Sequence, residues 1–181
     1  MTIYLIRHGK TVATERSLYC GSTDLPLSDA GIDALKQLRY NIDIKNVRFI
    51  TSGMKRTEQT LSVLFGAVPH VQEPRFREVD FGAFEMRSYE ELKNTAAYQA
   101  WLNGDNEINV PPNGESGAQM QARVRGAFSE INTDSVVVTH GGVISAIMAR
   151  LFPEEQKNRY EWTPAPGYGY VIQNYKYRSI P

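Results

Sequence analysis

Apolar and polar residues alternate along this chain in blocks that predict strands followed by helices. Short, mostly apolar runs predict buried strands at residues 3–6, 47–51, 136–139 and 169–175. Apolar residues three or four positions apart predict helices at 28–40, from 52 to the proline at 69, at 88–102, around 120–131 and at 143–151. Strands that alternate with helices are typical of a largely parallel sheet. The pattern therefore predicts an α/β fold of three layers, with a mostly parallel sheet and helices on both faces.

Polar residues mark where these elements begin and end. Ser28, Ser52 and Ser88 each precede a helical pattern and are predicted to be N-caps. The helix at 88–102 is expected to pack through Tyr89, Leu92, Ala96 and Trp101. We expect loops at 9–27 and 103–115 and an extended segment at 71–81. No repeat, low-complexity tract or linker divides the chain, so residues 1–181 are expected to form one domain.

A histidine follows each of the two clearest buried strands. The first strand runs into Arg7-His8-Gly9, and the strand at 136–139 runs into His140-Gly141. Ligands bind beyond the carboxyl ends of the strands in open α/β sheets, so both rings are expected at one edge. Histidine can form a covalent phosphoryl intermediate, and the guanidinium of Arg7 matches phosphate oxygens. The two strand ends therefore predict an anion site that contains a nucleophile.

Two further residues extend this prediction. Arg56 falls in the first turn of its helix, where the helix N-terminus already favours an anion. Glu78 could act as a general acid, because a carboxyl group beside a bound phosphate tends to hold a proton. Glu78 could instead pair with a nearby arginine at the surface, and Asp80 is its rival for the acid role. His70 stands alone and is interpreted as structural.

Composition excludes several classes of function. Twenty basic and twenty acidic residues cancel, which argues against nucleic-acid binding through broad basic charge. With three histidines and one cysteine, Cys20, the chain has no zinc-ligand spacing and no internal disulfide. The longest apolar stretch, 143–149, is too short to cross a membrane, and no signal peptide precedes the first strand. We expect a cytoplasmic protein without a metal site, a membrane partner or a nucleic-acid partner.

Four segments resemble, in order, the motifs of the histidine phosphatase superfamily, which includes cofactor-dependent phosphoglycerate mutases and many phosphatases. They are Arg7-His8-Gly9, residues 51–60, residues 78–82 and Thr139-His140-Gly141. The resemblance implies that His8 is the phosphorylated nucleophile and that Glu78 is the proton donor. It also implies that Arg7, Arg56 and His140 hold the phosphoryl oxygens. No metal is needed, because the arginines and histidines can neutralise the charge on the phosphoryl oxygens, and no other cofactor is implied.

Residues 18–28 resemble the α-ribazole phosphatase branch, which acts in the assembly of the cobalamin nucleotide loop. The motif 113–116, Asn-Gly-Glu-Ser, is similar to an element common among the phosphatases. This resemblance implies a small phosphomonoester substrate, such as α-ribazole 5′-phosphate. The residues expected near it are Lys10, Thr14, Tyr19, Cys20 and Gly21. Lys10 and Thr14 depart from the usual family residues. Residues 18–27 are expected near the mouth of the site, and the segment 103–114 is a candidate for another part of its rim. Tyr19 and Trp101 could pack on a ribose or base or could belong to the core.

Three functions are therefore compatible with the sequence. The first is a metal-independent phosphomonoesterase that works through a phosphohistidine. The second is a phosphoglycerate mutase, which would need a phosphoenzyme that excludes water. The third is a non-catalytic phosphate-binding or interaction module on the same fold. The complete set of cations, histidines and carboxylate favours the first function. The sequence indicates no oligomeric state.

Overall fold

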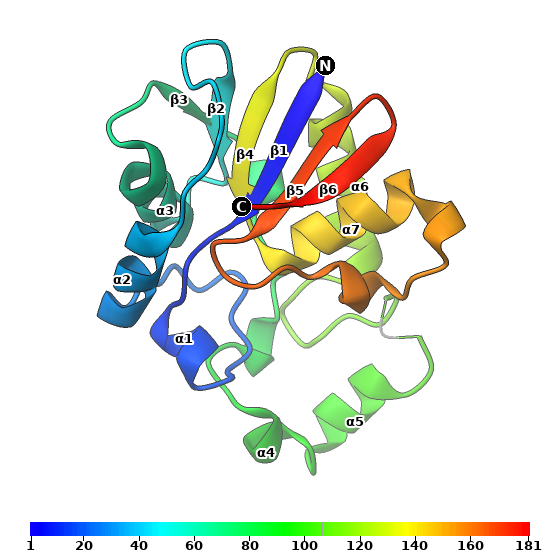
Figure 1. Cartoon of the computed structure of the whole chain (residues 1–181). Helices are drawn as coiled ribbons and strands as arrows, with labels where there is room; N and C mark the ends of the chain where they lie inside the picture. The colour runs from blue at the N-terminus through cyan, green and yellow to red at the C-terminus, as the bar shows by residue number, and fades with distance from the viewer. Residues whose placement is uncertain (106) are drawn as a thin grey trace.

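A six-stranded mixed sheet forms the centre of the computed structural model, which describes residues 1–105 and 107–181 (Figure 1). Its strand order is β3-β2-β4-β1-β5-β6. The strands are β1 (Thr2–Arg7), β2 (Arg48–Thr51), β3 (His70–Gln72), β4 (Ser135–Thr139), β5 (Gly169–Gln173) and β6 (Lys176–Ile180). Neighbours are parallel from β3 to β1, whereas β5 is antiparallel to β1 and to β6. The predicted α/β class with a mostly parallel sheet is confirmed.

Helices cover both faces of this sheet, as predicted. On one face lie α2 (Asp29–Gln37) and α3 (Lys55–Phe65), and on the other lie α6 (Gly117–Ser129) and α7 (Gly141–Leu151) (Figure 1). The central strands alternate between two cores. Leu5 and Val137 pack in the core with α6 and α7, whereas Ile6, Val136 and Val138 pack in the core with α3. This alternation follows from the period of two along a strand.

Shorter elements lie beyond the carboxyl ends of β1 and β4. They are α1 (Val12–Glu15), α4 (Tyr89–Leu92) and α5 (Ala96–Leu102), seen below the sheet in Figure 1. Single 3₁₀ turns are η1 (Pro74–Phe76), η2 (Gly82–Phe84), η3 (Pro153–Glu155) and η4 (Arg159–Trp162). Tyr98 of α5 packs with Phe84 and Leu92 in a separate small core. This core holds aromatic side chains close to the sheet edge where His8 and His140 lie.

Some element predictions were wrong. The helix expected at 88–102 is two helices, because Thr95 forms a second N-cap by accepting the amide hydrogen of Tyr98. Tyr89 and Ala96 are exposed in consequence, and Tyr98 is the buried aromatic residue. Ser28 and Ser88 are N-caps as predicted, but Ser52 is not: α3 begins after Met54 without a side-chain cap.

Other differences concern the ends of segments. The helix from Ser28 ends at Gln37 rather than near residue 40, and the loop at 9–27 contains α1. Within the segment 71–81 the strand ends at Gln72, and the 3₁₀ turn η1 interrupts the extended backbone at Pro74. The strand predicted at 169–175 is the first half of a hairpin. Asn174 and Tyr175 take positive φ angles of 51° and 58° at its turn, and β6 follows.

Candidate active site

Two histidines meet where β1 and β4 end. Arg7 and Thr139 are register partners, and the amide nitrogen of His8 donates to the carbonyl oxygen of Thr139 at 2.9 Å. The rings of His8 and His140 then lie edge to face, with centroids 5.1 Å apart and planes at 64°. Both side chains are buried, with 7% and 0% exposure. The parallel pairing of two distant strands thus brings the two predicted histidines together.

The ring of His8 has one nitrogen fixed and one free. Its Nδ1 lies 2.7 Å from the carbonyl oxygen of Gly9, which can only accept, so Nδ1 carries the hydrogen. Burial lowers the pKa of His8 well below its ordinary value, and the charge of Arg56 lowers it further. The ring is therefore neutral near pH 7 and leaves a lone pair on Nε2. That is the state that a nucleophilic histidine requires.

Two arginines flank the histidines: Arg56 is buried, and Arg7 is partly buried. Nη1 of Arg7 donates to the carbonyl oxygen of Pro164 at 2.8 Å, and its buried Nε has no hydrogen-bond partner among the described residues. Arg56 donates from Nη1 to the carbonyl oxygen of Thr23 at 2.8 Å and from Nη2 to that of Gly21 at 2.6 Å. Burial lowers the pKa of both guanidinium groups. Backbone carbonyls thus hold both cations in place, and no ion pair within the described residues neutralises them.

His140 uses both ring nitrogens. Nε of Arg56 donates to Nδ1 of His140 at 3.3 Å, and Nε2 of His140 lies 2.9 Å from Oγ of Ser52. Burial lowers the pKa of His140 well below its ordinary value, and Arg56 adds to the effect. His140 is also the residue that directly precedes α7. Ser52, predicted to be a helix cap, is instead a hydrogen-bond partner of this histidine.

Glu78 is held at the start of α7. Its Oε2 accepts the amide hydrogen of Gly142 at 2.8 Å, and its Oε1 accepts that of Val79 at 3.0 Å. A Cβ atom on Gly142 would lie 2.3 Å from Oε1, so the glycine makes room for the carboxylate. The surface ion pair considered for Glu78 is not formed: Arg75 pairs with two other acids. Asp80 accepts hydrogen bonds from Ser22 and Gly82 and therefore holds loops together.

A cavity of about 350 Å³ adjoins Glu78. Aromatic side chains form much of its wall, and Arg159 and Glu115 also reach it. The aromatic residues are Tyr19, Phe81, Trp101 and Tyr160. Glu107 pairs with Arg159 at 2.6 Å and so joins the segment after α5 to η4. The carboxylate proposed as the acid therefore faces a space large enough for an organic group of moderate size.

The residues predicted to lie near the substrate separate into two groups. Tyr19 lines the cavity, and the carbonyl oxygen of Gly21 accepts a hydrogen bond from Arg56. A Cβ atom at position 21 would lie 1.6 Å from the carbonyl oxygen of Val79, so only glycine fits there. Cys20 is partly buried, and burial raises the pKa of its thiol. Thr14 instead completes the capping box of α1, and Lys10 is exposed, with its carbonyl bonded to the amide of Ser28. In the rim segment 103–114, residue 106 lies outside the described residues.

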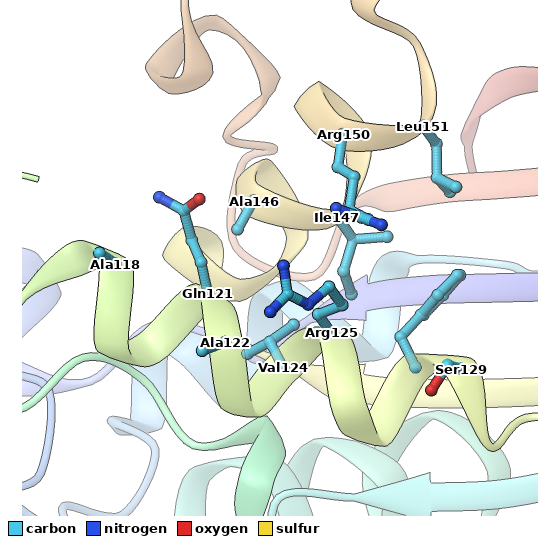
Figure 2. A pocket seen from close by; sticks show the side chains of 11 residues that line it. Ala118, Gln121, Ala122, Val124, Arg125, Ser129, Ala146, Ile147, Arg150 and Leu151 are labelled. Atoms are coloured by element: carbon cyan, nitrogen blue, oxygen red, sulfur yellow. The ribbon is translucent and has the colours of Figure 1, made fainter.

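A second hollow lies away from these residues. It is a groove of about 370 Å³ between α6 and α7, lined by apolar side chains such as Val124 and Ile147 and by Arg125 and Arg150, which extend into it from the two helices (Figure 2). None of the histidines or of the residues that hold them lines it. Within residues 1–105 and 107–181, no group of histidine, cysteine and acidic side chains could hold a metal ion. No described helix is long and apolar enough to span a membrane.

The sequence model of the histidine phosphatase superfamily (branch 1) matches residues 3–177. The chain belongs to this family. The adenosylcobalamin/alpha-ribazole phosphatase of Salmonella typhimurium is 32% identical over 161 residues, which cover 83% of this chain and 79% of the relative. A probable phosphoglycerate mutase GpmB of Yersinia enterocolitica is 28% identical over 163 residues, 83% and 74% of the two chains.

Solved structures of this family share the fold. The alpha-ribazole phosphatase of Shigella flexneri superposes with a TM-score of 0.84 and 27% identity, covering 99% of this chain and 96% of that one. A phosphoglycerate mutase of Thermus thermophilus superposes with a TM-score of 0.76 and 28% identity, covering 96% and 94%. The predicted family and the predicted phosphatase activity are confirmed.

Several functional groups were not predicted from the sequence. They are backbone atoms or polar side chains with no motif of their own: the carbonyls of Thr23 and Pro164, the amide of Gly142 and the hydroxyl of Ser52. Only Gly142 carried a signal, since it follows His140-Gly141 at the start of a helix. The others depend on contacts between segments that lie far apart in the chain.

Proposed function

We propose that the chain hydrolyses a small phosphomonoester whose leaving alcohol carries an aromatic group, such as α-ribazole 5′-phosphate, through a phosphohistidine. The observation that carries this proposal is the aromatic cavity beside Glu78. An alcohol seated there would place its ester oxygen near the carboxyl group and its phosphoryl group toward the histidines. The relatives named alpha-ribazole phosphatase support the same substrate class.

The first half of the reaction transfers the phosphoryl group to the protein. Nε2 of His8 forms a bond to phosphorus while the ester P–O bond breaks. Arg7, Arg56 and His140 hold the phosphoryl oxygens and stabilise their charge. Glu78 gives its proton to the leaving alkoxide, so that a neutral alcohol departs into the cavity.

The second half returns the protein to its starting state. Glu78, now a carboxylate, takes a proton from a water molecule as the oxygen of that water bonds to phosphorus. The N–P bond to His8 breaks, and inorganic phosphate leaves. A cytoplasmic site of action is part of this proposal, since the partly buried thiol of Cys20 suits a reducing compartment.

The experiment compares kcat/KM for α-ribazole 5′-phosphate, common nucleotides and phosphoglycerates after exhaustive chelation. We expect α-ribazole 5′-phosphate to be preferred by at least about tenfold, which is about 1.4 kcal/mol of transition-state binding. Trp101→Leu should reduce this preference, whereas Tyr89→Leu, outside the cavity, should not. Transfer of phosphoryl groups between phosphoglycerates would favour a mutase instead, and loss of activity on chelation would contradict the metal-free reaction.

A further inference from the structure

A chain of hydrogen bonds runs from His140 into the loop between β2 and α3. Nε2 of His140 lies 2.9 Å from Oγ of Ser52, and that oxygen lies 3.0 Å from Oγ1 of Thr57. The hydroxyl of Thr57 then donates to the carbonyl oxygen of Met54 at 2.8 Å. Ser52, Thr57 and His140 are all fully buried, so no solvent molecule competes for these contacts. The chain is therefore closed at its far end by a group that can only accept.

This end point fixes the direction of every hydrogen in the chain. The hydroxyl of Thr57 has one hydrogen, which it gives to the carbonyl of Met54. Ser52 must then donate to Thr57, and its oxygen is left to accept from His140. The hydrogen of neutral His140 therefore lies on Nε2. Its Nδ1 is a bare acceptor, which agrees with the hydrogen that it receives from Nε of Arg56.

A bare Nδ1 cannot hold a phosphoryl oxygen, because two acceptors repel each other. In the proposed function His140 contacts the phosphoryl group, and its Nε2 hydrogen is already given to Ser52. Arg56 is drawn toward the anion, since a guanidinium binds phosphate more strongly than it binds a neutral imidazole. The nitrogen that Arg56 leaves must then gain a proton before it can donate to the anion.

We propose that Ser52 and Thr57 are positioning residues that fix the tautomer of His140, so that binding of a phosphoryl dianion requires His140 to take up one proton at Nδ1. The inference rests on the proposed function, in which His140 contacts the phosphoryl group. The proton comes from solvent, and the product is an imidazolium that donates from both nitrogens.

The charges around His140 explain why the proton arrives only with the anion. Arg56 of α3, Arg7 and His8 from the end of β1, and Arg123 of α6 all disfavour a charge on this ring. The carboxylate of Glu78, bonded to Gly142, is the acid close to the start of α7. A bound dianion reverses the sign of the local field, so it favours the imidazolium that the empty site disfavours.

Nitrogen-15 NMR of the side chains tests the tautomer directly, since the chain has only three histidines. In the free protein we expect hydrogen on Nδ1 of His8 and on Nε2 of His140. Sulfate is the probe, because it is a dianion that does not itself titrate near neutral pH. On its addition both nitrogens of His140 should become protonated. Hydrogen on Nδ1 of His140 in the free protein, or a neutral His140 with sulfate bound, would overturn the inference.

The pH dependence of sulfate affinity gives a second measurement. Uptake of one proton predicts that the dissociation constant rises by about tenfold per pH unit above neutrality. The same slope should persist in His8→Ala, which removes the other ring that could take up a proton. If sulfate neither binds nor perturbs these rings and no phosphatase activity is found, the proposed function fails; if sulfate binds without the slope, only the present inference fails.

Two substitutions at Thr57 distinguish the effect of the hydrogen bonds on His140 from any effect of altered packing. Thr57→Val keeps the shape but removes the acceptor for Ser52, which is then free to donate to Nε2 of His140. We expect part of the His140 population to carry its hydrogen on Nδ1, against the hydrogen bond that Nδ1 otherwise accepts from Nε of Arg56, and the sulfate slope to become shallower. Thr57→Ser keeps the hydroxyl and should behave like the unmodified protein. A valine variant that folds with the same melting temperature and keeps both the Nε2 hydrogen and the slope would contradict the role of Thr57.

Discussion

The segments that follow β1 and β4 have the same local pattern and different chemistry. In each, an apolar strand ends in histidine and then glycine, and the two rings are buried 5.1 Å apart. His8 fixes its hydrogen through Nδ1 on the carbonyl of the next residue, so its Nε2 stays free. His140 is fixed by side chains from the β2–α3 region, and both nitrogens are in use. The end of a strand sets the position of the histidine ring, but the hydrogen-bond partners of that ring determine which nitrogen is free to react.

The largest effect that would test this comparison comes from removing each ring in turn. His8→Ala should reduce the turnover of phosphomonoesters by about 10⁴-fold or more, because it removes the nucleophile. His140→Asn should cost about 10²- to 10³-fold, because it removes only one group that stabilises the phosphoryl oxygens. Rapid quench in alkaline detergent should trap a phosphoprotein in His140→Asn, which later acid treatment dephosphorylates, and none in His8→Ala. Equal labelling of His8→Ala would reverse the assignment of the two rings.

Glu78 tests whether the free nitrogen of His8 works with an acid on the far side of the phosphoryl group. Glu78→Gln keeps the hydrogen bond from Gly142 but removes the proton, and general acid catalysis is worth about 10²- to 10⁴-fold. The loss should be large for alkyl phosphates and smaller for p-nitrophenyl phosphate, whose alcohol needs less protonation. Asp80→Asn is the control, since Asp80 bonds to Ser22 and Gly82. If Asp80→Asn alone shows this dependence on the leaving group, Asp80 is the acid.

The smallest expected effect concerns stability. Burial lowers the pKa of His8 and of His140 in the folded protein, whereas both rings titrate near 6.5 when the chain is unfolded. Below that pH the unfolded chain takes up protons that the folded chain does not. The contribution of these two rings to the free energy of unfolding should therefore be fully present above about pH 6.5. It should be lost as the pH drops, by up to about 1.4 kcal/mol per pH unit for each ring.

Urea denaturation between pH 7.5 and pH 5 measures this effect. His8→Gln and His140→Gln should each flatten the pH dependence, because each removes one ring that stays neutral below pH 6.5 in the folded protein but not in the unfolded chain. The comparison is made between variants, since other groups titrate in the same range. If the unfolding midpoint of a variant falls as steeply on acidification as that of the unmodified protein, the ring removed in that variant takes up its proton equally well in the folded and the unfolded protein.

The parts of the fold that follow from local pattern could be predicted from the sequence. The strand at 136–139 is buried on both faces, and an uninterrupted apolar run is the pattern that such burial requires. The same run predicted that His140 lies at the sheet edge that also holds His8. Arg56 could be placed in the first turn of α3 because helical periodicity identified the helix.

The remaining features depend on contacts that no local pattern contains. The hydroxyl of Ser52 is locally indistinguishable from a helix cap, and only the position of His140, 88 residues away, reveals its partner. The split between α4 and α5 depends on Thr95, whose hydroxyl competes with the helical backbone. The hairpin of β5 and β6 turns at Asn174 and Tyr175, and tyrosine is an uncommon residue at a positive φ angle.

The anchoring of Arg7 has a consequence for the order of events during synthesis. The backbone of Arg7 bonds to Gly167 and Tyr168, and its side chain bonds to Pro164. Pro164 is synthesised 157 residues after Arg7, so Arg7 and His8 emerge from the ribosome well before these partners. A nascent chain can therefore hold every residue proposed to react with phosphate and still lack the site that positions them. The site is therefore completed late in synthesis. Ribosome-bound chains that end before residue 164 should fail to bind sulfate.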